Sequence, residues 1–295
     1  MQQKQGLFLV IEGIDGSGKG TQFELLAKRL IEEGYDTATF DFPRYQEPSS
    51  YFVKEYLNGK YGTADEVGPY TGSLFFALDR FAAASAIKEA LNQGKVVLAN
   101  RYTGSNMAHQ GTKFSAADQR RNYFLWLENL EFQMLGVPRP DKNIILRVSA
   151  ETAQYYIDQK KKRSYTDKKR DLHEADLGHL RRAVEVYDDL GVLFPDDFRA
   201  IDCERDGKLL ELDSIHELIW NNIRPLLPPK SSRPKPLNSM PEKTSNPYVQ
   251  RTDTGYKITP AGEEYLKEAV TNGTDNVYAF TDKLSPLPSL RLWLD

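Results

Sequence analysis

The sequence has almost no cysteine, no long hydrophobic segment and no excess of charge of either sign. Cys203 is its single cysteine, which excludes an intrachain disulfide and a cysteine-based metal cage. We therefore expect a reducing compartment, the cytoplasm. The start, MQQKQ, and the short apolar run that Glu12 interrupts fit neither a signal peptide nor a membrane-spanning helix. With 39 basic and 42 acidic residues, we expect no nucleic-acid partner and no membrane partner.

Short apolar runs alternate with helical patterns in the first part of the chain. The apolar runs indicate buried strands at 7–12, 37–42, 95–100, 143–149 and 198–202. Helical patterns lie at 18–33, 73–94 and about 116–135. Strands that are apolar throughout and alternate with helices favour a parallel sheet covered on both faces. We therefore predict an α/β fold with a five-stranded parallel sheet.

The composition changes after residues 1–227, which we interpret as one domain. Residues 228–247 contain six prolines in twenty residues and few apolar side chains, so we predict an extended linker. We predict no particular fold for the extension at 248–295, although 260–270 has a helical pattern. Residues 255–266 faintly resemble the strand and helix at the wing of a winged-helix domain. The extension could instead join a second enzyme, dock on a partner, or have no fold of its own.

A glycine-rich loop follows the first predicted strand and opens the first predicted helix. Its pattern, Gly13-xxxx-Gly18-Lys19, is that of a phosphate-binding loop. Backbone N–H groups and the helix N-terminus attract the phosphates of ATP, and the lysine contacts the outer ones. A turn that serves packing alone is the alternative, and the lysine argues against it. The candidate ATP-binding residues are Gly13, Asp15, Gly16, Ser17, Gly18, Lys19, Gly20 and Thr21.

Two features of this loop need separate interpretation. Gly20 stands where Ser or Thr often ligates magnesium, and Thr21 can hydrogen-bond a phosphate instead. This Gly-Lys-Gly-Thr arrangement resembles nucleoside monophosphate kinases, such as adenylate kinase, rather than GTPase-like switches. Asp15 would repel the ATP phosphates unless it holds a sugar hydroxyl or a metal. A turn-forming aspartate with local hydrogen bonds is the plainer alternative.

Six separated motifs resemble those of thymidylate kinases in order and spacing. They are GIDGSGKGTQ, FPRY at 42–45, LFFALDRF at 74–81, NRYTGSNMAHQG at 100–111, EFQMLGVPRPD at 131–141 and RDLHE at 170–174. The resemblance covers about residues 6–225 and does not extend to the tail. It implies a P-loop NTPase fold and phosphoryl transfer from ATP to dTMP, with Mg²⁺ as cofactor and a homodimer as the assembly.

The resemblance also implies roles for individual residues. Phe76 would lie on the thymine ring, unless it only packs in the core. Arg80 would donate to a base carbonyl, with a surface salt bridge as the alternative, and Asn106 would bind the base edge. Arg101 would grip the acceptor phosphate. The further candidates for substrate binding are Asp15, Phe42, Arg44, Tyr45, His109 and Gln110.

The magnesium site and the sugar end include two departures from the family. Asp15 would contact the sugar 3′-hydroxyl and help to place magnesium, with Glu174 nearby. Most members have an aspartate where this chain has Asn100, and that aspartate steadies the metal and its waters. Asn100 loses this charge, so we expect weaker magnesium handling. His109 replaces a tyrosine that crowds the sugar 2′ position in many bacterial members, so it could loosen discrimination against ribose or be structural.

Residues 160–170 carry seven positive charges and one negative charge. Such a run is usually a solvated face, but thymidylate kinases have a mobile lid at this position. Some members supply an arginine to the transferring phosphoryl group from the phosphate loop, and others supply it from the lid. The loop position is Gly16 here, so we expect the lid-arginine arrangement, helped by Lys161 and Lys168. The candidate catalytic residues are Asp15, Lys19, Arg101, Arg163 and Arg170.

Two other functions stay open on the sequence alone. The acceptor could be another deoxynucleotide or a deoxynucleoside, although Asn106 and Arg80 argue for a pyrimidine with a carbonyl group. The chain could also be a nucleotide-binding module that no longer transfers phosphate. Asn100 favours this alternative, and the basic lid opposes it. The tail could then join the module to a second enzyme of thymidylate metabolism in a fusion protein.

Overall fold

The computed structural model describes residues 6–163, 177–229, 249–252 and 255–258. Backbone contacts divide the chain into two units, Met1–Ser232 and Arg233–Asp295. The described part of the second unit is an antiparallel hairpin of β8 (Val249–Thr252) and β9 (Gly255–Ile258). The helix predicted at 260–270 lies outside the described residues.

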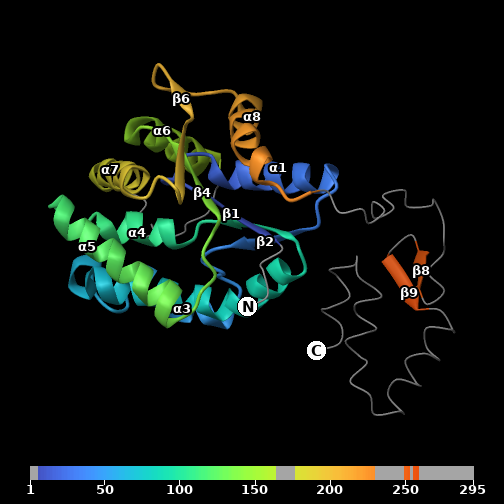
Figure 1. Ribbon diagram of the computed structural model, residues 1–295, viewed down its shortest axis with the longest axis horizontal. Helices are drawn as coiled ribbons and strands as arrows, with labels where there is room; N and C mark the ends of the chain where they lie inside the picture. The colour runs from blue at the N-terminus through green and yellow to red at the C-terminus, as the bar shows by residue number, and fades with distance from the viewer. Residues whose placement is uncertain (1–5, 164–176, 230–248, 253–254, 259–295) are drawn as a thin grey trace, which may run out of the picture. The chain divides into compact units, whose positions relative to one another are not determined.

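A five-stranded parallel sheet lies at the centre of the first unit (Figure 1). In spatial order its strands are β2 (Thr37–Asp41), β3 (Val96–Asn100), β1 (Leu7–Glu12), β4 (Lys142–Arg147) and β5 (Phe198–Asp202). All six residues of β1 are buried, as expected for the central strand of a sheet with both faces covered. The predicted α/β fold and its five strands are confirmed, with strand ends that differ from the predictions by no more than two residues.

Helices surround this sheet. They are α1 (Lys19–Glu32), α2 (Tyr51–Leu57), α3 (Ala64–Asn92), α4 (Thr103–Gly111), α5 (Ala117–Glu128), α6 (Ala150–Arg163), α7 (Leu177–Leu193) and α8 (Leu212–Ile223). The shorter elements are η1 (Pro48–Ser50), η2 (Asn129–Met134), η3 (Arg224–Leu226), β6 (Glu204–Arg205) and β7 (Lys208–Leu209). In Figure 1, α1 and α8 lie above the sheet and α3 lies below it. No helix within the described ranges is both long and apolar enough to cross a membrane.

Alternate residues of β1 enter two separate cores. Leu9 and Ile11 pack in one core with buried residues of α1, α5, α7 and α8. Phe8 and Val10 pack in the other, largely against α3. Successive residues of a strand point to opposite faces, so this single strand anchors both layers. Its carboxyl end, like that of β3, is followed by a loop at one edge of the sheet, where ligands bind in folds of this kind.

Helix α3 is longer than the helix predicted at 73–94. It begins after Thr63, which forms a capping box with Glu66. Gly68 has a φ of +74° and precedes Pro69, so the helix is kinked at this point. Because Gly68 and Pro69 interrupt the helical pattern, the sequence periodicity does not predict the first part of α3.

The helix predicted over about 116–135 is also corrected, because α5 ends at Glu128 and continues as the π-helical turn η2. Helices α2, α4, α6 and α8 are not predicted. In α4 the sequence TGSNMAHQG is rich in residues of low helix propensity, and eight of its residues are buried. Tertiary packing therefore decides its conformation.

Candidate active site

The loop between β1 and α1 packs so closely on its neighbours that two of its positions admit only glycine. A Cβ atom at Gly13, where φ is +141°, would lie 2.8 Å from the carbonyl oxygen of Leu146. A Cβ atom at Gly16, where φ is +83°, would lie 2.3 Å from the carbonyl oxygen of Ala153 in α6. Helix α1 begins after Gly18 with no side-chain cap, so the N–H groups of its first turn stay available to an anion.

The polar side chains of this loop differ in their surroundings. The Ser17 hydroxyl is buried, and within the described part of the chain it has no hydrogen-bond partner. Gly20 and Thr21 are exposed in the first turn of α1. A buried hydroxyl without a partner, close to free backbone N–H groups, fits a loop whose ligand would complete its hydrogen bonds.

Lys19 and Asp15 form an ion pair within the loop. The Nζ atom of Lys19 lies 3.4 Å from Oδ1 of Asp15 and donates to the carbonyl oxygen of Ile14 at 2.9 Å. Burial, together with the charge of Arg101, lowers the pKa of Lys19 to about 8. Burial disfavours the charged form of Asp15, but Arg101 and Lys19 outweigh it and hold the pKa of that carboxyl well below its usual range. Asp15 is therefore ionised.

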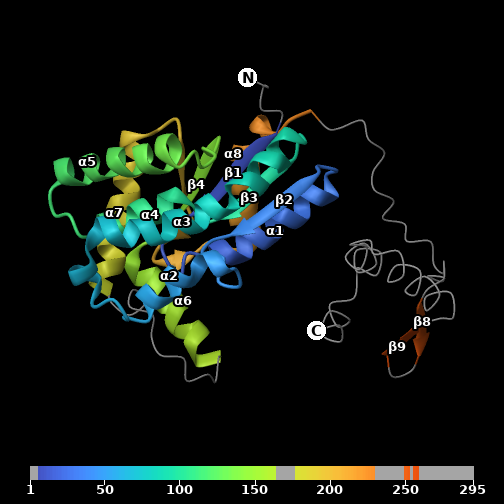
Figure 2. The same cartoon turned by 90° about the horizontal axis from the view of Figure 1, so that it is seen from below.

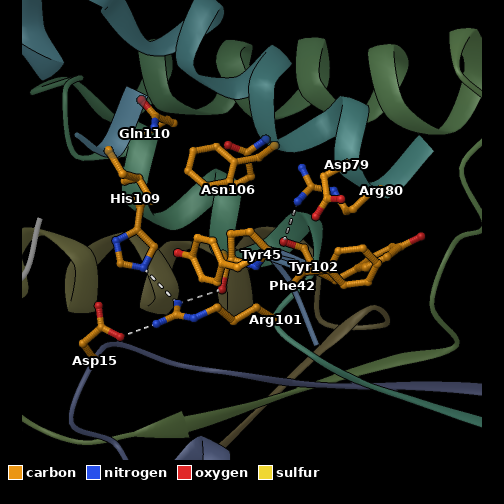
Figure 3. Close-up of a pocket in the computed structure, with 14 residues that line it drawn as sticks. Asp15, Phe42, Tyr45, Asp79, Arg80, Arg101, Tyr102, Asn106, His109 and Gln110 are labelled. Carbon is orange, nitrogen blue, oxygen red and sulfur yellow. Dashed lines mark hydrogen bonds and ion pairs between the residues drawn. The ribbon is translucent and has the colours of Figure 1, made fainter. Parts of the chain in front are cut away.

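Arg101 follows β3 and reaches the same carboxylate. Its Nη2 atom pairs with Oδ1 of Asp15, and its Nη1 atom lies 3.1 Å from both Oγ of Ser105 and Nε2 of His109 (Figure 3). Its backbone has a φ of +62°, which non-glycine residues rarely adopt and which costs about 1 kcal/mol. The surrounding structure therefore holds this guanidinium at a fixed place beside the loop.

The carboxylate of Glu12 imposes that conformation. Glu12 is fully buried and accepts hydrogen bonds from the backbone N–H groups of Tyr102 at 2.8 Å and Ser105 at 3.0 Å. The hydroxyl groups of Ser105 and Tyr187 donate to its Oε2 atom at 2.6 Å and 3.0 Å. Glu12 thus joins the end of β1 to the turn that carries Arg101 and to α7.

A pocket opens beside these charges, between the loop, α3 and α4. The empty space within it amounts to about 780 Å³, including the part open to solvent. Nine of the predicted substrate-binding residues line it, namely Asp15, Phe42, Tyr45, Phe76, Arg80, Arg101, Asn106, His109 and Gln110. Lining residues that the sequence analysis does not name are Pro43, Leu57, Asp79, Tyr102 and Ser105.

Arg44 is the predicted residue that does not line this pocket. Its Nε atom lies 3.2 Å from Oδ1 of Asp79, and its backbone N–H donates to Oδ2 at 2.8 Å. Arg44 also donates to Ser49 at 2.9 Å. These contacts fix the loop after β2 on α3. Asp79 belongs to the LFFALDRF motif and directly precedes Arg80. This carboxylate beside a predicted site residue is the sequence feature that could have identified Asp79.

The far end of the pocket combines one donor and one acceptor. Arg80 makes two hydrogen bonds of 2.6 Å to the buried Glu131, so the surface salt bridge offered as its alternative role is wrong. The Nδ2 atom of Asn106 donates to the carbonyl oxygen of Ser73 at 3.1 Å and lies 3.5 Å from Oε1 of Glu131. Both partners are oxygens that can only accept, so the NH2 group of the amide must face them. Its Oδ1 atom then has no hydrogen-bond partner in the described part.

Phe76 lies on the wall of this end of the pocket. Its ring contacts Tyr56 edge to face, with 6.2 Å between the ring centroids, and the side chain is half-buried. A residue that only packed in the core would not line the cavity. The remaining ring face is therefore available to a flat ligand.

Asn100 lies beside a carboxylate of the neighbouring strand. Asp41 and Asn100 are register partners at the ends of β2 and β3, and Nδ2 of Asn100 donates to Oδ1 of Asp41 at 2.9 Å. Asp41 is exposed, but desolvation by its neighbours raises its pKa, although the Asn100 amide and the charges of Arg101 and Lys19 oppose the shift. A carboxylate therefore lies at this end of the sheet, on the strand next to Asn100.

The lid candidates are mostly outside the described residues. Arg163 is the last residue of α6, whose C-terminal end projects beyond the neighbouring helices in Figure 2. Arg170 and Glu174 fall in the part of the chain that is not described, as does Lys168. The roles of these residues stay predictions.

We predict that Asn100→Asp destabilises the protein as pH rises. Two carboxylates would then lie at hydrogen-bond distance, and their repulsion would raise the pKa of one of them further. A carboxyl whose folded pKa is raised binds its proton more tightly in the folded state, so stability falls as pH increases above about 4. Because Asp41 is exposed, we expect a loss of only about 1 kcal/mol at pH 8 and less at pH 5, measured by urea unfolding.

The matched control exchanges the two side chains. Asp41→Asn combined with Asn100→Asp restores one amide and one carboxylate, so its unfolding free energy should return to that of the wild type at both pH values. Equal stability of the single variant and the wild type at pH 8 would contradict the coupling.

Comparisons with known proteins agree on one family. A sequence model of the thymidylate kinase family matches residues 11–208. The thymidylate kinase of Mycobacterium tuberculosis is 34% identical over 190 residues, which cover 62% of this chain and 85% of that protein. A probable thymidylate kinase of Pyrobaculum aerophilum is 33% identical over 221 residues, or 74% of this chain and 98% of that protein.

A solved structure of Candida albicans thymidylate kinase has the same fold. It covers 75% of this chain and 92% of its own, with a TM-score of 0.57 and 22% sequence identity. The match with the family model includes the phosphate loop, the pocket and the turn that carries Arg101. The chain belongs to the thymidylate kinase family.

Proposed function

We propose that this protein transfers the γ-phosphoryl group of ATP to dTMP, giving dTDP and ADP in the cytoplasm. The observation that carries the proposal is the order of groups along the pocket. The donor Arg80 and the acceptor Asn106 lie at one end, and Arg101 and Asp15 lie at the other end beside the phosphate loop (Figure 3). A base with a complementary edge at the first end would bring its 5′-phosphate to the second.

The polar pair matches the edge of thymine. Its ring N3–H can donate to Oδ1 of Asn106, and its O4 carbonyl can accept from Arg80. Cytosine offers an acceptor at N3 and an amino group at C4, so both contacts would be mispaired. Glu131 binds Arg80 and lies next to the Asn106 amide, which keeps both groups in this orientation. Phe76 supports stacking of the ring.

The acceptor needs no general base, because a nucleotide phosphate is already ionised near neutral pH. One of its oxygens forms a bond to the γ-phosphorus of ATP while the bond to the β,γ-bridging oxygen breaks. Lys19 and Arg101, which now pair with Asp15, would turn to the phosphates and neutralise their charge. We expect Arg163 or Arg170 to add the lid arginine.

The donor set at the loop fits a magnesium ion. Mg²⁺ takes oxygen ligands and usually binds through one or two carboxylates together with substrate phosphates. Asp15 is ionised, and its carboxylate becomes available when the phosphates take over Lys19 and Arg101. We propose Asp15 as a ligand or as a partner of the sugar 3′-hydroxyl, with Glu174 as the second carboxylate. When bound, Mg²⁺ would offset the charge of the phosphates.

The exposed apolar side chains of α3 support a homodimer. Tyr70, Leu74, Leu78 and Phe81 recur every three or four residues, and each is at least 39% exposed. This spacing places them along one side of the helix. A stripe of this kind on a water-exposed helix is typical of an interface. We propose that two copies of the chain pair through this face.

We predict that the full chain, with ATP and Mg²⁺, releases ADP rapidly with dTMP. With dCMP, kcat/KM should be lower than with dTMP by a factor of about a hundred or more, because two buried polar groups would be mispaired. Thymidine should be inactive because it offers Arg101 no phosphate. A coupled ADP-release assay with dTMP, dUMP, dCMP, UMP and thymidine measures this, with Lys19→Met as the control for dependence on the loop.

Two results would contradict this proposal in different ways. Faster release with dCMP than with dTMP would mean that the polar pair is misassigned. Binding of ATP and dTMP by calorimetry, without ADP release for any acceptor, would favour the nucleotide-binding module instead.

We predict that the double variant Leu78→Glu and Phe81→Glu is a monomer, because four charges (two per copy) would face each other without partners. Light scattering after size-exclusion chromatography should give about 34 kDa instead of twice the 33.6 kDa chain mass. Leu125→Glu, an exposed leucine on α5, is the control and should remain a dimer. A monomeric wild type at assay concentration would refute the assignment of this face.

A further inference from the structure

Two histidines connect the Arg101 guanidinium to helix α7. Nε2 of His109 lies 3.1 Å from Nη1 of Arg101, and Nδ1 of His109 lies 3.3 Å from Nε2 of His179. The two imidazole rings are nearly parallel, with 5.6 Å between their centroids and 18° between their planes. His109 lines the pocket and His179 does not, so His179 lies one layer behind it. His179 is buried near the start of α7.

The chemistry of arginine fixes the direction of this chain of hydrogen bonds. A guanidinium group can only donate, so Nε2 of His109 must accept and carries no hydrogen. The His109 ring is then neutral with its hydrogen on Nδ1, which donates to Nε2 of His179. A neutral His179 must therefore carry its own hydrogen on Nδ1. Each link requires the next one to accept.

The same helix supports Arg101 at a second point. Tyr187 lies eight residues after His179, and this spacing places both on one face of α7. The hydroxyls of Tyr187 and Ser105 donate to the same atom, Oε2 of Glu12, which holds their oxygens 3.2 Å apart, and Ser105 accepts from Arg101. His109 and Ser105, which both accept hydrogen bonds from Nη1 of Arg101, are thus both positioned by side chains of α7. One end of the guanidinium is set by Asp15 and the other by this helix.

We propose that His179 is a positioning residue for the acceptor phosphate. It accepts the Nδ1–H of His109 and so fixes the orientation of that ring, and His109 in turn holds Nη1 of Arg101 at the end of the pocket where the phosphate of dTMP lies. The inference rests on the proposed function in one respect, because the phosphate is that of the acceptor. His179 touches no substrate. Its loss therefore acts on the grip of the acceptor and not on the loop that binds ATP.

Two substitutions separate the hydrogen bond from the packing. His179→Gln places an amide oxygen near the position of Nε2 and can still accept from His109. His179→Phe keeps a stacked ring of similar size but accepts nothing. We expect KM for dTMP to rise about fivefold or more in His179→Phe, the effect of one lost hydrogen bond, and to stay within about twofold in His179→Gln. KM for ATP should stay within about twofold in both.

A histidine elsewhere in the fold supplies the control. His216 lies on α8, and its Nδ1 atom has no hydrogen-bond partner in the described part of the chain. His216→Phe should leave both KM values unchanged. Equal effects of His179→Gln and His179→Phe, or parallel increases in KM for dTMP and ATP, would overturn the positioning role.

The hydrogen on His109 can also be observed directly in the full chain without nucleotide. The sequence has only four histidines, so ¹⁵N-labelled side chains can be assigned by NMR with the single variants. We expect the Nδ1–H form of His109 in the wild type and in His179→Gln. In His179→Phe this hydrogen has no acceptor, and we expect it to exchange faster with water. An Nε2–H form in the wild type would refute the proposal. A wild type that makes no ADP with dTMP would refute the proposed function alone, since the NMR result needs no turnover.

Discussion

The arrangement of the site depends on the buried carboxylate of Glu12. A buried charge is costly unless hydrogen bonds compensate it, and Glu12 receives them from two backbone N–H groups and two hydroxyls. These donors come from the turn after β3, from α4 and from α7. The strand that leads into the phosphate loop thereby also sets the backbone of Arg101, so the ATP side and the acceptor side of the pocket share one anchor.

The anchor explains why the backbone around Arg101 can keep an unfavourable φ. The two N–H groups that flank the start of α4 are committed to Glu12, and the N–H of Arg101 itself donates to the carbonyl oxygen of Ile11 at 2.9 Å. Little freedom is left in between. The backbone that carries the guanidinium then needs no reorganisation when the ligand arrives, and only the side chain turns from Asp15 to the phosphate.

The parallel sheet and the loop could be predicted from the sequence because both are written in local patterns. Buried strands appear as continuous apolar runs, and the loop appears as glycines followed by lysine. The pocket residues could be placed only through resemblance, since the helix α4 that carries Asn106 has poor helix propensity. Pairs that join distant residues could not be predicted at all. Arg44 and Asp79 are 35 residues apart, and His109 and His179 are 70 residues apart. In each pair, the sequence around one residue does not indicate the other.

Asn100 shows the same limit at a single position. In the sequence it is a missing charge, and this loss favoured a module without catalysis. In the fold its amide faces Asp41 on the adjacent strand, so a carboxylate lies next to Asn100 at this end of the sheet. The residue judged alone suggests a lost charge, whereas the pair shows a carboxylate beside it. The register of two strands, which no local pattern encodes, makes the difference.

The contact between Gly16 and α6 has a consequence for how the family can diversify. A side chain at this position would collide with the backbone of Ala153, which cannot rotate away as a flexible side chain could. In this chain a loop arginine is therefore out of reach by one substitution, because α6 would have to move first. A member of this fold with an arginine at this position would need α6 to lie farther from the loop. The source of this one cation is therefore coupled to the position of a whole helix.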